Sequence, residues 1–317
     1  VHDEEFASTP HFPYPSGPRE YQKQAFENWK DNGQRGLFAM ATGTGKTITS
    51  LNCLLEIYKR RGYYKAIILV PTQTLVEQWV DECRKFNFKK IYKVYSRNRR
   101  WKDEIEALHL KEDFNYSCNN DSFIIISTYE SFARANVFKS LAGFSRTQTL
   151  LIADETHNMG AGRILDRLDG IKYVRRIGLS ATPNRQYDDV ANRRLSEFFG
   201  SVNGYTFEYS MREAIDNGFL CRYYYYPHVV YLDDDEMAEY IKISLQLAKF
   251  FNYDSSTFPQ GDDILMALLL KRKRIVHKAK DKENVFLEIL KQRYKEKGNL
   301  KYTLVYVPEG NKPDETS

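Results

Sequence analysis

Short apolar runs recur through the first two thirds of the chain, each bounded by polar or glycine-containing segments. Five of them read GLFAM (36–40), KAIILV (65–70), SFIIIS (122–127), TLLIA (149–153) and RRIGLSA (175–181). Most of these runs are short, rich in branched residues and apolar on both faces. They therefore predict strands of a parallel sheet that is covered on both sides.

The segments between these runs place apolar residues at helical spacing. Residues 47–62 carry a leucine-rich stripe that ends at Gly62, and residues 74–86 bring Leu75 and Trp79 onto one side. Strands alternate with helices in this way over about 200 residues. The pattern predicts a doubly wound α/β domain.

The pattern changes after residue 220. Residues 221–232 (CRYYYYPHVVYL) read as an extended segment, and 233–251 read as a helix whose acidic first turn is favourable against the helix dipole. Residues 263–297 read as a long helical stretch, and KYTLVYVPEG (301–310) reads as a strand followed by a turn. The predicted organisation is an N-terminal extension (1–17), a first α/β domain (18–222), an extended linker with a helical connector (223–300) and the truncated start of a second α/β domain (301–317).

Composition fits a folded globular chain, because 42% of the 317 residues are hydrophobic and 28% are charged. No apolar run approaches the ~20 residues that a membrane span requires, and the first residues lack the apolar core of a signal peptide. We therefore expect a cytoplasmic protein with no membrane partner, associated with the nucleoid if the source is bacterial. Because the sequence does not begin with Met, we expect it to be processed or to be a fragment of a longer protein.

Cysteine spacing and net charge narrow the candidate chemistry. Cys53, Cys83, Cys118 and Cys221 are widely spaced and form no C-x-x-C pair. This spacing argues against a zinc site or a disulfide framework and favours idle thiols in a reducing compartment. The net charge of +5 permits a polyanionic partner without demanding one, so the position of the basic residues is more informative than their number.

The first apolar run leads directly into a flexible polar stretch, FAMATGTGKT. A strand, a glycine-rich turn ending in Gly-Lys-Thr and a helix form a phosphate-binding loop, in which Gly43 and Gly45 let backbone amides point towards phosphate oxygens. Lys46 would reach the β- and γ-phosphates, and the Thr47 hydroxyl would bind Mg²⁺. Met40 stands where the general pattern has Gly, and an ordinary glycine-rich turn is the competing interpretation.

A phosphate loop needs a metal partner, and the segment LLIADETH supplies candidates for it. Asp154, at the end of the predicted strand, can hold Mg²⁺ through water. Glu155 beside it can orient and polarise an attacking water molecule. An acidic helix cap after a strand is common by itself, but its pairing with a phosphate loop about 110 residues earlier favours a nucleotide site.

These motifs resemble, in this order, those of superfamily 2 helicases and translocases of the DExH type. The segments that carry the resemblance are MATGTGKT (40–47), VPTQTLVEQW (70–79), ISTYES (126–131), DETH (154–157) and GLSATP (178–183). Upstream, PREYQKQAFENW resembles the family's adenine-reading motif, with Pro18 where Leu is usual, and residues 223–307 are similar to the XPB-like branch, which includes bacterial repair and restriction-type motors. The resemblance implies a RecA-like first domain, with 301–317 beginning a second one, and it accommodates Met40.

The resemblance also implies roles for residues around the nucleotide. Gln22 would read the adenine edge through its side-chain amide, with Arg19 nearby. Phe12 or Tyr14 could stack on the base, although ordinary packing is the simpler interpretation of each ring. The residues implied to bind ATP in the loop are Thr42, Gly43, Thr44, Gly45, Lys46 and Thr47, and the implied catalytic residues are Lys46, Asp154, Glu155 and His157.

His157 would link the ATP site to the segment of Ser180, Ala181 and Thr182, whose hydroxyls can exchange hydrogen bonds as two lobes move. A lone histidine is more often a satisfied polar residue. In the family an arginine finger from the second lobe completes the site, in a motif that this sequence does not contain. We therefore expect this chain to bind ATP with Mg²⁺ but to hydrolyse it slowly by itself.

Nucleic-acid contacts are implied at two further motifs and suggested by one basic segment. The implied phosphate contacts are Thr72, Gln73 and Thr74 in the first motif, and Ser127, Thr128 and Tyr129 in the second. Helix capping by Ser and Thr is an equal alternative for each. The basic segment SRNRRWK places Arg97, Arg99 and Arg100 beside Trp101, which suggests phosphate contact, although a charge run is more often a solvated face.

The leading hypothesis is a nucleic-acid-dependent ATPase motor, a helicase or translocase, acting on duplex DNA in repair or in restriction and antiviral defence. The resemblance favours DNA over RNA because a DEAD-box RNA helicase would show PTRELAxQ and DEAD where this chain has PTQTLVEQ and DETH. The alternative is an ATP-switched scaffold without motor activity, and the intact Glu155 argues against it. A nuclease is a third option, but the sequence carries no Asp…Glu-x-Lys cluster outside these motifs, so cleavage would belong to other domains or partner subunits.

Overall fold

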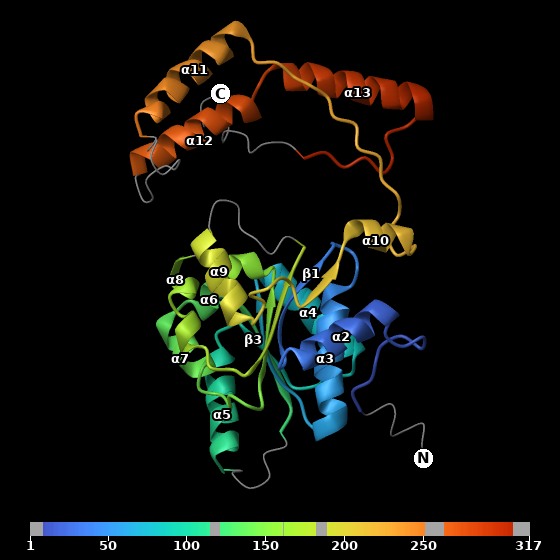
Figure 1. Ribbon diagram of the computed structural model, residues 1–317, viewed down its shortest axis with the longest axis vertical. Helices are drawn as coiled ribbons and strands as arrows, with labels where there is room; N and C mark the ends of the chain where they lie inside the picture. Colours follow the sequence, from blue (N-terminus) through green and yellow to red (C-terminus); the bar gives the residue numbers. More distant parts are fainter. Residues whose placement is uncertain (1–8, 115–120, 161, 182–188, 251–262, 307–317) are drawn as a thin grey trace. The chain divides into compact units, whose positions relative to one another are not determined.

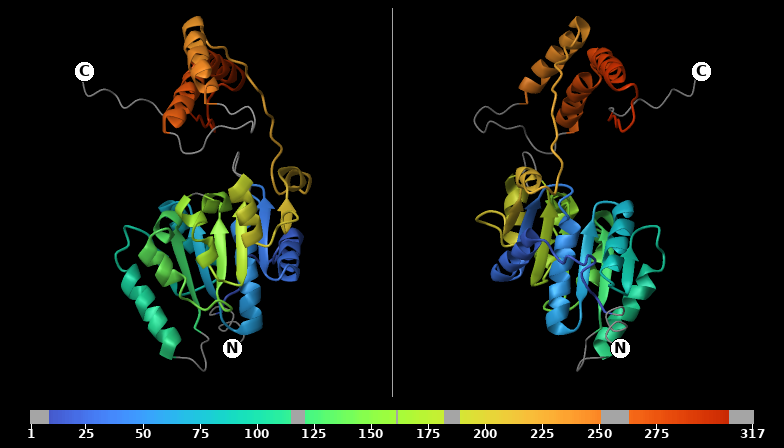
Figure 2. Two further views of the ribbon diagram at one scale, coloured as in Figure 1. Left: turned by 60° about the vertical axis from the view of Figure 1, so that its left-hand side comes forward. Right: turned by 90° about the vertical axis from the view of Figure 1, so that its right-hand side faces the viewer.

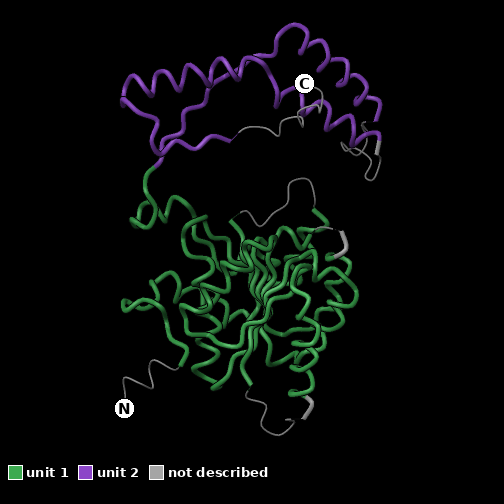
Figure 3. The backbone as a smooth tube through the Cα atoms, turned by 180° about the vertical axis from the view of Figure 1, so that it is seen from behind, with its two compact units in different colours: residues 1–222 green, residues 223–317 purple. Residues whose placement is uncertain are grey.

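The computed structural model describes residues 9–114, 121–160, 162–181, 189–250 and 263–306 (Figure 1). The chain divides into two compact units, 1–222 and 223–317 (Figure 3). Two residues singled out above, Cys118 and Thr182, lie outside the described residues.

The first unit is built on a seven-stranded sheet in the order β3-β4-β2-β5-β6-β1-β7, and its strand pairs are parallel. The strands are β1 (Arg35–Met40), β2 (Lys65–Val70), β3 (Ile91–Val94), β4 (Phe123–Thr128), β5 (Leu150–Asp154), β6 (Arg175–Ser180) and β7 (Phe207–Tyr209). The five strands predicted from apolar runs are confirmed, and every residue of β2, β4 and β5 is buried. The architecture is the predicted RecA-like doubly wound α/β fold.

The apolar pattern did not predict β3 and β7, which are the two edges of this sheet. Three of the four residues of β3 are only half-buried, and β7 has three residues with Glu208 exposed in the middle. An edge strand has one neighbour and is covered on fewer sides, so it needs no continuous apolar run.

Helices cover both faces of the sheet (Figures 1 and 2). One face carries α2 (Glu20–Asp31), α3 (Lys46–Arg61) and α4 (Gln73–Lys85), and the other carries α5 (Trp101–Phe114), α6 (Tyr129–Phe132), α7 (Ala135–Leu141) and α9 (Asp189–Phe198). Short elements complete the unit: η1 (Thr156–Gly160), α8 (Gly162–Leu165), η2 (Leu168–Gly170) and α10 (Met211–Asp216). Neighbouring residues of β1 enter different cores, Leu37 in one and Phe38 in the other, as the pleat of a strand requires.

The second unit begins with the predicted extended segment and continues into α11 (Asp234–Ala248), α12 (Asp263–His277) and α13 (Asp281–Lys297). Asp233 caps α11 in a capping box with Glu236, so the acidic start predicted for this helix also sets its boundary. Ile243 and Leu247 of α11 pack against Leu265 of α12 in a small core.

The strand predicted at 301–310 is not formed in its described part, since residues 301–306 adopt turn and irregular conformations. A strand is stable only when a neighbouring strand pairs with its backbone, and these residues have no such neighbour among the described strands. The assignment of 301–317 to a second RecA-like domain therefore stays a prediction. In the described part of the chain, no helix combines the length and the apolar composition needed to cross a bilayer.

Candidate functional site

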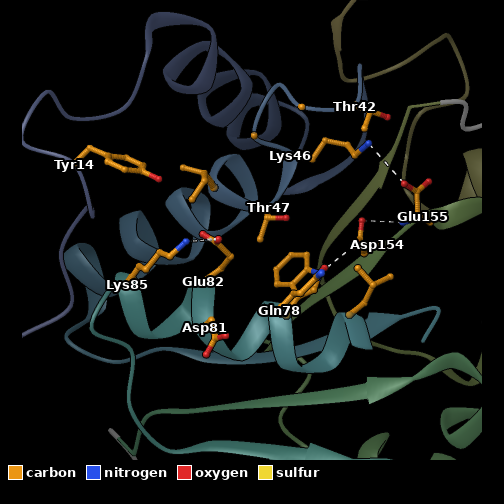
Figure 4. A pocket seen from close by; sticks show the side chains of 15 residues that line it. Tyr14, Thr42, Lys46, Thr47, Gln78, Asp81, Glu82, Lys85, Asp154 and Glu155 are labelled. Atoms are coloured by element: carbon orange, nitrogen blue, oxygen red, sulfur yellow. Dashed lines mark hydrogen bonds and ion pairs between the residues drawn. The ribbon is translucent and has the colours of Figure 1, made fainter. Parts of the chain in front are cut away.

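The two nucleotide motifs meet in one cavity of about 590 Å³ at the carboxyl edge of the sheet (Figure 4). Parallel strands bring the loops that follow them to the same edge, which is where α/β folds bind ligands. The predicted residues that line this cavity are Thr42, Gly43, Gly45, Lys46, Thr47, Asp154 and Glu155. Segments about 110 residues apart in the sequence are thus brought face to face.

The loop between β1 and α3 has the curled backbone that phosphate binding requires. Gly43 and Gly45 have φ angles of 84° and 82°, in the left-handed region that favours glycine. Gly45 is the N-cap of α3, whose first amides have no acceptor within the helix and form a natural anion site. Met40 is fully buried at the end of β1, so its side chain fills the core where the general pattern has Gly.

Hydrogen bonds within the loop and from α2 hold the loop in this shape. The Thr44 hydroxyl and amide both donate to the Ala41 carbonyl oxygen, at 2.6 Å and 3.3 Å. The Thr44 side chain is thus fully buried and engaged inside the loop, and ATP binding by Thr44 stays a prediction. The Tyr21 hydroxyl donates to the Thr44 carbonyl oxygen at 2.6 Å and links the loop to α2.

Asp154 ends β5 with 7% of its surface exposed, and both of its carboxylate oxygens are oriented by N–H donors. The Glu155 amide donates to Oδ1 at 3.0 Å, and the Trp79 indole donates to Oδ2 at 2.9 Å. Burial raises the pKa of Asp154, and the hydrogen bond from Trp79 acts against that shift by favouring the carboxylate.

Glu155 faces the phosphate loop. Its Oε1 lies 3.7 Å from Lys46 Nζ, so the predicted base and the predicted phosphate-binding cation form an ion pair (Figure 4). Its φ angle of 47° is unusual for a residue other than Gly. Backbone outliers of this kind cluster at functional sites, where the surrounding structure holds them in place.

The residues predicted to couple the site to a second lobe lie in one group. The Ser180 hydroxyl, at the end of β6, donates to Glu155 Oε2 at 3.4 Å and lies 3.4 Å from His157 Nδ1. His157 Nδ1 is also 3.6 Å from Glu155 Oε2. Ala181 directly follows β6, and Thr182 lies outside the described residues.

The residues predicted to recognise the base occupy different places. Gln22 is buried, accepts the Arg19 amide hydrogen at 2.9 Å and lies against Gly45 from behind the loop rather than among the cavity-lining residues described above. The Arg19 guanidinium lies over the Phe219 ring, 4.2 Å from its centroid. Of the two aromatic candidates, Phe12 packs on the core, whereas Tyr14 is half exposed and lines the cavity.

The first set of predicted nucleic-acid residues gathers on this same edge of the sheet. Thr72 caps α4 by accepting the Leu75 amide hydrogen, and it remains exposed together with Thr74. Gln73 donates to the Ser96 hydroxyl at 3.2 Å. That bond places the start of α4 beside residues 95–100, the arginine loop, whose three arginines (Arg97, Arg99 and Arg100) are all exposed.

The second set is corrected by the structure. Thr128 is buried and caps α6 by accepting the Ser131 amide hydrogen. Ser127 is fully buried and donates to the Val94 carbonyl oxygen. Tyr129 is buried as well, and its hydroxyl donates to the Asp154 carbonyl oxygen at 2.7 Å. These side chains are not available to nucleic acid, because the capping and packing alternatives hold for them.

Sequence reasoning missed the part of the cavity that α4 supplies. Gln78, Asp81, Glu82 and Lys85 line it, at the three- and four-residue spacing that puts side chains on one face of a helix. That spacing was a usable signal. Trp79 was expected only as a packed residue, and no pattern in the sequence indicated that its indole reaches Asp154.

Known proteins resemble this chain in sequence and in fold. Residues 16–185 match the family model described as "Type III restriction enzyme, res subunit". The Type I restriction enzyme EcoAI endonuclease subunit of Escherichia coli is 28% identical over 213 residues, which cover 65% of this chain and 23% of that protein. A protein of Sulfolobus islandicus filamentous virus named as a helicase is 23% identical over 231 residues, which cover 72% of this chain and 37% of that protein.

The fold is shared with the crystal structure of the Pyrococcus furiosus Hef helicase domain. The superposition has a TM-score of 0.50 at 17% sequence identity and covers 90% of this chain and 55% of that chain. This chain therefore matches part of a longer motor domain, and it spans less than two fifths of each curated relative.

Proposed function

Because this chain belongs to the family of Type III restriction enzyme res subunits and carries a superfamily 2 helicase-like motor domain, we propose that it is the first lobe of an ATPase motor that acts on duplex DNA. The observation that carries the proposal is the shared cavity, in which Lys46 of the phosphate loop pairs with Glu155 of the DETH box at 3.7 Å. Work on DNA, in restriction and defence or in repair, implies an intracellular protein.

The residues of the cavity fit ATP and Mg²⁺ by their chemistry. The left-handed Gly43 and Gly45 and the free amides at the start of α3 suit a chain of phosphates. The Thr47 hydroxyl and the Asp154 carboxylate line the same cavity and offer the hard oxygen ligands that Mg²⁺ prefers. Bound there, Mg²⁺ would neutralise charge on the phosphate oxygens.

The protein's own groups supply the remaining steps. Lys46 would bind the terminal phosphates, which would release Glu155 from their ion pair. Glu155 would then orient and deprotonate the attacking water. Ser180 and His157, in contact with Glu155, would report its state to a second lobe.

DNA would lie along the start of α4 and the arginine loop. The exposed Thr72 and Thr74 and the three exposed arginines form a polar and basic surface at one edge of the sheet. Contacts of this kind go to phosphates and position the duplex without reading its sequence. The similarity to the EcoAI endonuclease subunit supports a restriction role, with cleavage supplied by other domains or subunits.

The test is the ATPase rate of the full-length protein with and without duplex DNA. Turnover should need Mg²⁺ and rise with DNA, and Glu155→Gln should bind ATP but lose turnover at least about 100-fold, because a positioned base contributes that much. Tight ATP binding with no DNA-stimulated turnover in the wild type would instead favour an ATP-switched scaffold.

A further inference from the structure

Helix α4 connects the proposed DNA surface to the carboxylate of the nucleotide site. Its first residues, Gln73 and Thr74, lie at the edge beside the arginine loop. Trp79, on the same helix, is 2% exposed, and its indole N–H donates to Asp154 Oδ2 at 2.9 Å. Trp79 lies six positions after Gln73, which corresponds to a rise of about 9 Å along the helix axis.

The bond from Trp79 does more than fill space. Packing alone would not need an N–H, but the indole places a donor on one oxygen of a carboxylate whose other oxygen already accepts the Glu155 amide hydrogen. With both oxygens bound, the carboxylate plane is fixed relative to the cavity.

The helix can carry a displacement because it is one continuous element of 13 residues. Its contacts differ between its start, an exposed polar edge at Gln73, and its middle, where Trp79 meets a buried charged acceptor. Suppose that a ligand at the start of α4 binds more tightly to one position of the helix than to another. It will then also favour the geometry of the Trp79–Asp154 bond that belongs to that position.

We propose that Trp79 is a positioning residue that orients the Asp154 carboxylate and transmits DNA binding at the start of α4 to the Mg²⁺ requirement of the ATP site. The inference rests on the proposed function, because it places DNA at Gln73 and Mg²⁺ at Asp154. It adds a residue, and a route through α4, that the motifs themselves do not contain.

The test uses the full-length protein and a pair of matched variants. Trp79→Phe removes the indole N–H and keeps an aromatic ring. Trp29→Phe is the control, because the Trp29 indole is fully buried and donates to the Arg176 carbonyl oxygen at 2.9 Å, away from the cavity. For each variant, the Mg²⁺ concentration that gives half-maximal ATPase is measured with and without duplex DNA, together with the melting temperature.

We expect Trp79→Phe to raise the half-saturating Mg²⁺ concentration about ten- to hundredfold, the usual loss when an outer-shell partner of a metal ligand is removed. DNA should lower the half-saturating Mg²⁺ concentration of the wild type but should leave that of the variant unchanged. Trp29→Phe should lower the melting temperature and change none of these quantities.

Unchanged Mg²⁺ dependence and DNA response in Trp79→Phe, with a DNA-stimulated wild type, would overturn the inference alone. A wild type that DNA does not stimulate would overturn the proposed function instead. Should Trp79→Phe fail to fold, β-(3-benzothienyl)alanine introduced at position 79 keeps both fused rings and replaces only the N–H by sulfur. The same shifts are expected of it, and their absence would equally contradict the role assigned to Trp79.

Discussion

The hydrogen bond from Tyr21 to the phosphate loop offers a test of how the loop is held. The Tyr21 hydroxyl donates to the Thr44 carbonyl oxygen at 2.6 Å, and both residues are buried. Tyr21 also stacks on Tyr209 of β7, with ring centroids 4.2 Å apart, so its ring is fixed without the hydroxyl. Tyr21→Phe should therefore remove this bond, together with the one that the hydroxyl accepts from Arg19 Nη1 at 3.1 Å, and leave the packing intact.

The size of the effect follows from the burial of the acceptor. A buried carbonyl that loses its partner costs about 1–3 kcal/mol, and this cost falls on the curled form of the loop. If the loop relaxes to other conformations, nucleotide binding must restore the curled form. A weakening of the affinity between about fivefold and about 150-fold is expected, since about 1.4 kcal/mol corresponds to tenfold.

The assay is calorimetric titration with a non-hydrolysable ATP analogue, paired with thermal denaturation. Tyr173→Phe is the matched control, because the Tyr173 hydroxyl also donates to a buried backbone carbonyl, that of Leu141, on the opposite face of the sheet. Both variants should lose stability, but only Tyr21→Phe should lose affinity. Equal affinity in Tyr21→Phe and the wild type would refute the idea that α2 preorganises the loop.

Three further predictions concern the loop, the carboxylate and the basic edge. Gly45→Ala should weaken nucleotide binding about tenfold, because a left-handed φ of 82° costs other residues about 1–2 kcal/mol; Gly62→Ala, at 77° beyond the other end of α3, should lower the melting temperature and spare the affinity. Because burial raises the pKa of Asp154, titrations between about pH 3 and pH 8 should show Mg²⁺-dependent binding failing at a higher pH than an exposed aspartate would allow; a fall only near the ordinary aspartate pKa would contradict this. Replacing any one arginine of the arginine loop by Ala should reduce the slope of log K for duplex DNA against log salt by up to about 1, and an unchanged slope for all three would remove that loop from the DNA surface.

The fold was largely predictable because buried parallel strands leave a simple mark in the sequence. β2 and β4 are apolar at nearly every position, since helices cover both of their faces. The edge strand β3 (IYKV) leaves no such mark, because half of its surroundings are solvent or a single helix. The run at 301–310 led to the opposite error, because a strand was predicted where the described residues form none. An apolar run forms a strand only where a partner strand is present.

The site was predictable to the extent that its chemistry lies in contiguous motifs. Lys46 and Glu155 meet because each follows the carboxyl end of a strand in one parallel sheet. The burial of Tyr129 was not predictable, because the same hydroxyl suits a phosphate contact or a buried backbone carbonyl. Trp79 was out of reach for a similar reason: its partner is 75 residues away, and only the packing of α4 on the sheet decides where the indole points.

The most direct test of the central claim is the affinity of this chain for Mg²⁺ and a non-hydrolysable ATP analogue, measured by calorimetry for the wild type, Lys46→Ala and Lys59→Ala. Lys59 is exposed near the other end of α3 and pairs with Glu56, so its loss controls for charge on the same helix. We predict that Lys46→Ala binds at least about tenfold more weakly, because it loses a charge-assisted contact to phosphate, and that Lys59→Ala binds as the wild type does. Wild-type affinity in Lys46→Ala would contradict the assignment of the cavity to a nucleoside triphosphate.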